Sequence, residues 1–247
     1  MREELARAYA FLARGDMGGT RTEPSHCGRA VYTDELPRRL DGNYLWVDQA
    51  AEPGELAAEA ARLERRLIFV PDPAIGMRLV PWFAERGWRV DRHLVMVQLR
   101  EPDRTADLSL VRELGEEALR PARRRLLEHE PWAKPEVVEQ LFRAKALIGE
   151  RVTTRFFGIE VDRVVVSYTD LYTDGADAQI EDVGTLPEHR GRGYASAVVL
   201  AAIEAARASG AVFVCLVADA EDWPKELYRR LGFDEVGHYT KFFAPGT

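Results

Sequence analysis

The spacing of apolar and polar residues changes repeatedly between strand and helix periods along the second half of the chain. Apolar or alternating runs predict strands, and apolar positions three and four residues apart predict amphipathic helices. The predicted elements are a strand beginning at 108–111, helices at 115–131 and 134–151, strands at 156–161, 164–172 and 178–185, a helix at 194–209, a strand at 211–218, a helix at 225–231 and a last strand at 239–243. Gly210 suits the end of the 194–209 helix. The pattern predicts an α/β domain.

The first half of the chain contains a similar but poorer succession of elements. Strands are predicted at 44–47, 67–70 and 93–99, and helices at 54–66 and 78–88. Aligning Gly87 with Gly232 superposes helix, turn and strand in the same order, which indicates a partial internal repeat. We therefore predict two domains, 1–103 and 104–247, separated by the polar stretch REPDRTAD. The alternative is that an aromatic residue after glycine is only a common helix ending.

Length and composition fit a globular protein and exclude several classes. The chain has 247 residues, is 46% hydrophobic and carries a formal charge of −7, so a nucleic-acid surface is not expected. No apolar run is long enough for a bilayer, and the start lacks a signal-peptide core, so we expect a cytoplasmic protein without a membrane partner.

Cys27 and Cys215 do not suggest a disulfide framework, and His26 beside Cys27 has no second pair for a metal. The arginine-rich segment 120–130 is interpreted as a solvated helix face.

The most informative segment is VGTLPEHRGRGYA at residues 183–195, which predicts a strand, a polar turn and the start of a helix. We call residues 190–196 the glycine turn. Gly191 and Gly193 free the backbone to turn, and the N–H groups at the start of the helix lack partners within the helix. Together with Arg190 and Arg192, these N–H groups form a site suited to a pyrophosphate.

Two motifs resemble the GCN5-related N-acetyltransferase (GNAT) family. The spacing Arg190-x-x-Gly193-x-Ala195 resembles its acetyl-CoA motif, and LYRRLGF at 227–233 resembles its second landmark, a helix with a tyrosine that ends at Gly-Phe. The resemblance implies a mixed central sheet flanked by helices, with acetyl-CoA as co-substrate and no metal. The residues implied in binding CoA are Val183, Gly184, Thr185, Arg190, Gly191, Arg192, Gly193, Tyr194, Ala195 and Ser196.

Other phosphate-binding folds fit the segment less well. The glycines approach a dinucleotide-binding fingerprint, but Ser196 replaces its third glycine and only about 50 residues follow, too few for a second half-sheet. A Walker loop is excluded because no Gly-Lys-Ser/Thr occurs. The remaining alternative is an ordinary exposed turn.

The resemblance implies that Tyr228 is the general acid that protonates the leaving thiolate, a role that suits a phenol protonated at neutral pH. Glu181, on the strand before the glycine turn, is the candidate general base. In a regular strand Asp182 would point to the opposite face, so only one of the two carboxylates should face the cleft. Loss of the amine proton without a side-chain base is the alternative. Gly184 and Thr185 are smaller than usual in the family and predict a thioester pocket that is roomier or differently shaped.

The predicted function is therefore transfer of an acetyl group from acetyl-CoA to an amine of a small molecule or peptide. The competing interpretations are a non-catalytic CoA-binding or regulatory module and a structural interaction protein. The first half has Phe83 opposite Tyr228 and AEPGELA in place of the glycine turn, so we expect one active site, with the first half packing beside it and walling the acceptor cleft. The acceptor, the acyl chain length and the oligomeric state, with a homodimer among the options, are left open.

Overall fold

The computed structural model describes residues 3–15, 17–128 and 130–246, which divide into two compact units. Unit 1 contains Met1–Val95, Ala218–Asp222 and Glu235–Thr247, and unit 2 contains Met96–Val217 and Trp223–Asp234. The C-terminal strand therefore belongs mostly to the first unit. The predicted division at residues 103 and 104 concerns homology between the two halves and stays a prediction.

Unit 1 is a mixed sheet with helices. Its elements are α1 (Glu3–Arg14), β1 (Arg21–Ser25), β2 (Gly28–Tyr32), η1 (Leu40–Gly42), β3 (Tyr44–Val47), α2 (Pro53–Arg62), β4 (Leu67–Val70), α3 (Pro73–Glu85), most of β5 (Arg89–Gln98) and most of β11 (Phe233–Phe243). The strand order is β1-β2-β3-β4-β11-β5. Strands β3 and β4 are parallel, and β11 runs antiparallel to β4. The hairpin of β1 and β2 was not predicted from the sequence.

The core of unit 1 accounts for the difference between Phe83 and Tyr228. Phe83 is fully buried, and its ring lies 4.9 Å from that of Trp88 and 4.5 Å from that of Phe242. Leu45 and Leu56 belong to the same cluster. Phe83 therefore packs the core of unit 1.

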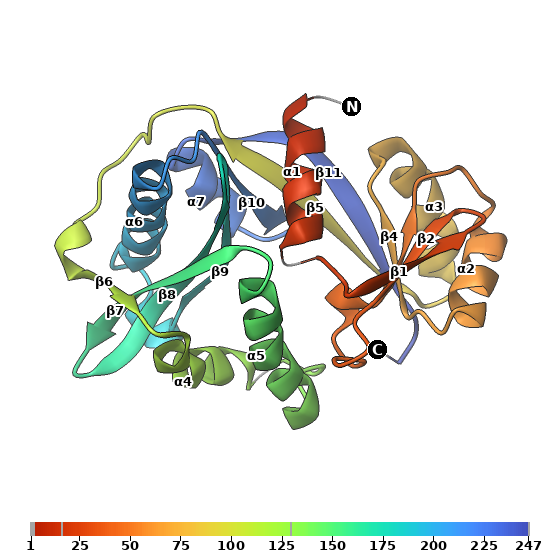
Figure 1. Ribbon diagram of the computed structural model, residues 1–247, viewed down its shortest axis with the longest axis horizontal. Coiled ribbons are helices and arrows are strands. Elements are labelled where there is room, and N and C mark those ends of the chain that lie inside the picture. Colours follow the sequence, from red (N-terminus) through yellow and green to blue (C-terminus); the bar gives the residue numbers. More distant parts are fainter. Residues whose placement is uncertain (1–2, 16, 129, 247) are drawn as a thin grey trace. The chain divides into compact units, whose positions relative to one another are not determined.

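Unit 2 is built on strands in the order β10-β9-β8-β7-β6. Its elements are η2 (Leu108–Leu110), β6 (Val111–Leu114), α4 (Glu116–Leu127), α5 (Pro135–Gly149), β7 (Thr153–Val161), β8 (Val164–Asp174), β9 (Asp177–Thr185), η3 (Pro187–His189), α6 (Tyr194–Ala208), β10 (Phe213–Asp219, through Val217) and α7 (Pro224–Arg230). β9 and β10 are parallel, and the other neighbours are antiparallel. Figure 1 shows α6 on one side of β8 and β9, and α4 and α5 on the other.

Local chemistry explains several boundaries in unit 2. Asp162 and Arg163 both have positive φ, 51° and 65°, which is the conformation of a tight hairpin turn between β7 and β8. Gly210 has φ 96° just after α6, as expected for a helix-ending glycine. The strand predicted to begin at residue 108 was placed too early. Asp107 accepts a hydrogen bond from the Ser109 N–H at 2.9 Å, which stabilises a 3₁₀ turn, and the strand begins at Val111.

The structure confirms the predicted α/β class and the mixed sheet flanked by helices. The helix–strand order of the first half is also as predicted: β3, α2, β4, α3 and β5 follow one another as β9, α6, β10, α7 and β11 do. The parallel pairing of β3 with β4 matches that of β9 with β10.

Candidate functional site

The glycine turn follows β9 and η3 in the chain and runs into the N-terminus of α6. Gly191 and Gly193 have φ 75° and 81°, a left-handed conformation that side chains disfavour. A β-carbon at either position would meet nothing within 4 Å. The two glycines are therefore required by backbone conformation, and the space beside them is open to a ligand.

The start of α6 offers backbone donors. Within the part of the chain that the structure describes, no side chain caps this helix. The N–H groups of its first turn have no intrahelical acceptor, and the helix dipole makes this end positive. Tyr194, Ala195 and Ser196 form this turn, so the structure brings them together with the two glycines as predicted.

The arginines of the glycine turn lie at the surface. Arg190 donates from Nε to the Thr185 carbonyl oxygen at 3.2 Å, which ties its side chain to the end of β9. Arg190 and Arg192 are both exposed. Two guanidinium groups beside uncapped helix N–H groups suit a polyphosphate.

The end of β9 has one unpaired edge. Its ladder with β10 runs from Asp177–Phe213 to Ile180–Leu216, whereas β9 continues to Thr185. On the β10 side, no ladder pair of the described chain reaches Val183, Gly184 or Thr185. Backbone groups on such an edge are able to hydrogen-bond an extended ligand.

A β-bulge interrupts β9 just before this edge. The register with β8 shifts between Tyr168 and Asp170, and Asp182 has φ 53°. Thr169 on the bulge donates from Oγ1 to the Glu181 carbonyl oxygen at 3.0 Å. An extra residue in one strand breaks the alternation of side chains.

The bulge overturns the prediction that Glu181 and Asp182 point to opposite faces. Glu181 pairs in register with Asp170, whose side chain contacts Lys145. Asp182 contacts the same Lys145, with the ion pair measuring 3.3 Å. Both carboxylates therefore lie on the face of the sheet covered by α4 and α5.

A buried charge network occupies this face. It consists of Arg123 from α4, Lys145 from α5, Asp170 and Tyr172 from β8, and Asp182. Lys145 lies 2.7 Å from an Asp170 oxygen and donates to the Tyr172 hydroxyl at 3.0 Å. Arg123 forms ion pairs with Asp170 and, at 2.8 Å, with Asp182.

The burial of Arg123 corrects the interpretation of residues 120–130 as a solvated helix face. Arg124 and Arg125 are half exposed, but the Arg123 side chain is only 3% exposed. The sequence carried a signal for this network. Asp170 is the one charged residue in the strand segment VVVSYTDLY, and a buried charge needs a partner.

Electrostatics favour the charged forms of Asp182 and Lys145, whereas burial raises the pKa of Asp170. Burial alone would raise the pKa of Asp182, but Lys145 and Arg123 outweigh it and hold that pKa below its ordinary value. Burial opposes the charge on Lys145, yet Asp170 raises the pKa of this amine well above its usual range. Asp182 is thus a paired anion rather than a proton acceptor.

Tyr228 lies on α7 and is buried. Its side chain is 7% exposed, and its ring meets that of Phe233 edge to face at 6.3 Å. Gly232, at φ 89°, turns the chain after α7, and a β-carbon there would lie 2.1 Å from the Arg100 carbonyl oxygen. The predicted Gly-Phe landmark therefore fixes how the tyrosine-bearing helix joins β11.

The small residue at Gly184 does not enlarge the site. A β-carbon at Gly184 would lie 2.4 Å from the ring of Tyr168, which is buried. Ser167 donates to the Gly184 carbonyl oxygen at 3.0 Å. Of the two predicted alternatives, the roomier pocket is wrong on this side, because the Tyr168 ring fills the space that glycine leaves.

Comparison with protein-family models identifies the domain. The model of the acetyltransferase (GNAT) family matches residues 114–233. These residues form a GNAT acetyltransferase domain. The match includes β9, the glycine turn and α7, and it supports acyl transfer as the class of reaction. Comparison with curated proteins gives no significant sequence match.

Solved structures resemble the chain over most of its length. A GCN5-related N-acetyltransferase from Kribbella flavida is 18% identical, with 100% of this chain and 97% of that chain covered at a TM-score of 0.62. A functionally unknown conserved protein from Staphylococcus epidermidis ATCC 12228 is 13% identical, covering 92% and 94% at 0.68. A tandem GNAT protein from the clavulanic acid biosynthesis pathway, without AcCoA, is 16% identical, covering 92% and 84% at 0.55. At these identities the likeness is one of fold.

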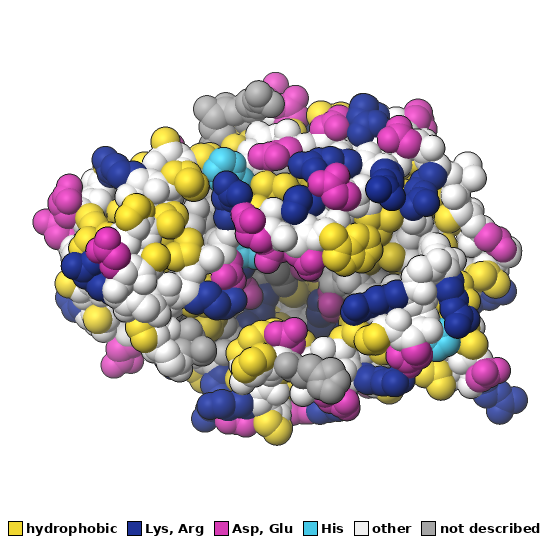
Figure 2. Space-filling model, turned by 180° about the vertical axis from the view of Figure 1, so that it is seen from behind, with side chains coloured by type: hydrophobic (Ala, Val, Ile, Leu, Met, Phe, Trp, Pro, Cys, Tyr) yellow, Lys and Arg dark blue, Asp and Glu magenta, His cyan; other side chains and the backbone are white. Residues whose placement is uncertain are grey.

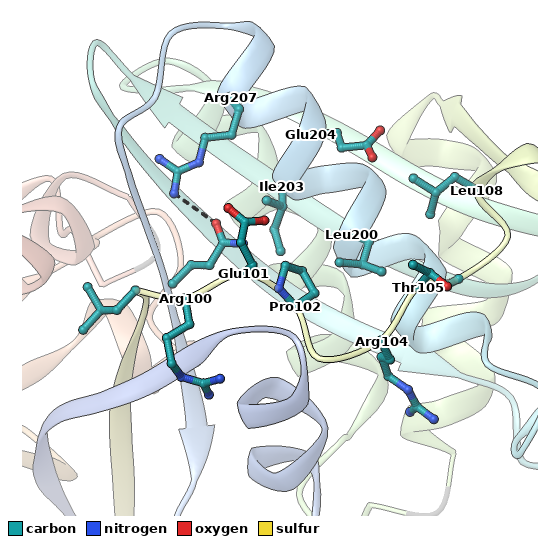
Figure 3. Close-up of a pocket in the computed structure, with 13 residues that line it drawn as sticks. Arg100, Glu101, Pro102, Arg104, Thr105, Leu108, Leu200, Ile203, Glu204 and Arg207 are labelled. Atoms are coloured by element: carbon teal, nitrogen blue, oxygen red, sulfur yellow. Dashed lines mark hydrogen bonds between the residues drawn. The ribbon is translucent and has the colours of Figure 1, made fainter.

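A separate pocket of about 880 Å³ lies in unit 2 between residues 98–108 and α6. Its wall on α6 includes Leu200, Ile203 and Glu204, and Arg207 donates to the Gln98 side chain at 3.0 Å (Figure 3). None of the predicted site residues lines it. This pocket is therefore distinct from the glycine turn of the acetyltransferase domain.

The surface carries charges of both signs. On the face that Figure 2 shows, acidic and basic side chains are interspersed. Among the described residues, no cluster of three or more His, Cys, Asp and Glu side chains could hold a metal ion. Over residues 3–15, 17–128 and 130–246, no helix combines the length and apolarity needed to cross a membrane. Cys215 is buried in β10, as predicted for a core residue.

Proposed function

We propose that the GNAT domain transfers an acetyl group from acetyl-CoA to an amine of a small molecule or peptide. The observation that carries this proposal is the glycine turn. Gly191 and Gly193 are left-handed, the N-terminus of α6 is uncapped, and the unpaired edge of β9 lies a few residues before them. Members of the matched family use acetyl-CoA, and the turn fits its pyrophosphate.

The proposed binding roles follow from position. N–H groups of Gly191, Gly193 and the first turn of α6 would bind the pyrophosphate, with Arg190 and Arg192 beside them. The backbone of Val183, Gly184 and Thr185 would hydrogen-bond the pantetheine arm along the edge of β9. One of these N–H groups would polarise the thioester carbonyl.

Acetyl-CoA would supply the acetyl group as a thioester, whose C–S bond breaks as the N–C bond to the acceptor forms. Tyr228 would donate its hydroxyl proton to the leaving sulfur. Glu181 would take one proton from the amine nitrogen. The products are then an amide and CoA with a free thiol, and both residues regain their starting states by exchange with water.

Glu181 is a better base than Asp182. The Asp182 carboxylate is engaged with Arg123 and Lys145, and those cations disfavour its protonation. Glu181 accepts a hydrogen bond from a neutral amide, that of Gln179. An amide donor orients the carboxylate without adding a charge of its own. Loss of the amine proton directly to water is the alternative route.

The first half is proposed as a degenerate GNAT-like domain, residues 1–103, preceding the catalytic domain, residues 104–247. The shared order of elements and the buried Phe83 support this division. Many relatives in the family have an asparagine seven residues before the tyrosine, and Glu221 occupies that position here. Glu221 forms an exposed ion pair with Arg92 at 2.7 Å. Its side chain is therefore not assigned to pantetheine binding.

Replacing Gly193 with alanine should weaken acetyl-CoA binding about tenfold. An alanine in the left-handed conformation costs about 1–2 kcal/mol. The turn relieves this strain by leaving the conformation that binds the ligand, so the binding free energy falls by a similar amount. Isothermal titration calorimetry measures the dissociation constant. The matched control is Gly115→Ala, because Gly115 also precedes a helix in open space but has φ −73°. Equal affinity of the two variants would remove the glycine turn from the binding site.

The direct test of catalysis is a screen of an amine library with acetyl-CoA, following the release of free thiol. We expect thiol release that depends on both the protein and the amine. Binding of acetyl-CoA without thiol release for any amine would favour the competing interpretation, a non-catalytic CoA-binding module.

A further inference from the structure

Gln179 is the residue that contacts the proposed base. It lies two positions before Glu181 on β9, is fully buried, and pairs in register with Tyr172. Its side-chain Nε2 donates to a Glu181 carboxylate oxygen at 2.6 Å. The two side chains therefore lie on the same face of the sheet, the one covered by α4 and α5.

The other end of the Gln179 amide is unsatisfied. Its Oε1 atom is buried and has no hydrogen-bond partner among the described residues. A buried carbonyl oxygen without a partner destabilises the folded state, and an apolar side chain of the same shape would avoid that loss. Packing therefore does not explain a glutamine at this position. Its N–H donor, directed at Glu181, does.

We propose that Gln179 is a positioning residue, which holds the Glu181 carboxylate in the orientation that receives the proton of the acceptor amine. This inference rests on the proposed function, in which Glu181 is the base. A donor on one carboxylate oxygen restricts the side-chain rotamer, and an ionised carboxylate keeps further lone pairs that accept a proton. Because the amide is neutral, it favours the ionised carboxylate without cancelling its charge.

The charged and titratable groups on this face come from four elements. They include Asp182 on β9 itself, Tyr168, Asp170 and Tyr172 on β8, Glu116 and Arg123 on α4, and Lys145 on α5. Arg123 and Lys145 form ion pairs with Asp170 and Asp182. Replacing Gln179 leaves all of these groups in place, so the effect on Glu181 is separable from theirs.

The first experiment needs no acceptor. In protein labelled with ¹³C at the glutamate carboxyl carbons, the Glu181 signal is the one missing from Glu181→Gln. Gln179→Met keeps the side-chain shape and removes the donor, so the Glu181 signal should titrate about one pH unit higher. Gln179→Glu brings a second carboxylate close to the first and should shift the titration further upward. The melting temperature of Gln179→Met should stay close to that of the parent, because removing the unsatisfied oxygen offsets the loss of the hydrogen bond to Glu181.

The second experiment measures kcat/KM against pH with acetyl-CoA and the amine that reacts fastest in the screen. The acid limb of the pH profile should move to higher pH in Gln179→Met, as the Glu181 titration does. The dissociation constant for acetyl-CoA should stay unchanged. An unshifted Glu181 titration, or a melting temperature well below the parent's, would overturn the role of Gln179. An acid limb that persists in Glu181→Gln would instead overturn the base itself, and thus that part of the proposed function.

Discussion

Tyr228→Phe should lower kcat for acetyl transfer by about 100-fold or more and leave the affinity for acetyl-CoA unchanged. Positioned general acids contribute about 10²–10⁴-fold to rate, and this substitution removes only the hydroxyl that would protonate the sulfur. The ring remains to pack edge to face with Phe233, so the fold is retained. Steady-state rates of thiol release measure kcat, and calorimetry measures binding.

The matched control for this substitution is Tyr32→Phe. Tyr32 lies in unit 1, where its hydroxyl donates to Glu23 at 3.3 Å, and it has no role in the proposed chemistry. We expect its rate to equal that of the parent. A Tyr228→Phe rate within twofold of the parent would show that the sulfur leaves without a proton from this phenol.

Asp170→Ala lowers the free energy of unfolding by about 3–5 kcal/mol. Asp170 is fully buried and is the shared partner of Arg123 and Lys145, so its removal leaves two buried cations partly uncompensated. Urea denaturation followed by circular dichroism measures the change. If Asp170→Ala fails to fold, Tyr172→Phe, which removes hydrogen bonds and no charge, should cost about 1 kcal/mol.

A surface ion pair between the same two helices provides the comparison. Arg124 and Glu139 lie 2.8 Å apart, with side chains 50% and 59% exposed. Glu139→Ala should change stability by about 1 kcal/mol or less, because water screens such a pair. Equal losses for Asp170→Ala and Glu139→Ala would mean that the buried network contributes no more than a surface contact.

The glycine turn was predictable because its determinants are local. Gly191 and Gly193 are separated by one residue, and the helix that follows them has a clear apolar pattern, so sequence spacing alone indicated the anion site. The same holds for the end of α6 at Gly210. The family model then matched the segment that carries both motifs.

The face of the sheet beside Glu181 was not predictable in the same way. The bulge at Asp182 arises from the pairing of β9 with β8, and pairing register is a tertiary property. Arg123 and Lys145 lie on different helices and meet only after both have packed on the sheet. An expectation based on regular alternation therefore separated Glu181 from Asp182, although the folded chain places them together.

Titration of the full chain with acetyl-CoA by isothermal titration calorimetry tests whether the glycine turn forms one CoA site per chain. We expect one binding site per chain with micromolar affinity, weakened by Gly193→Ala and unaffected by Gly115→Ala. Absence of binding at micromolar concentration, or two equivalent sites per chain, would contradict it.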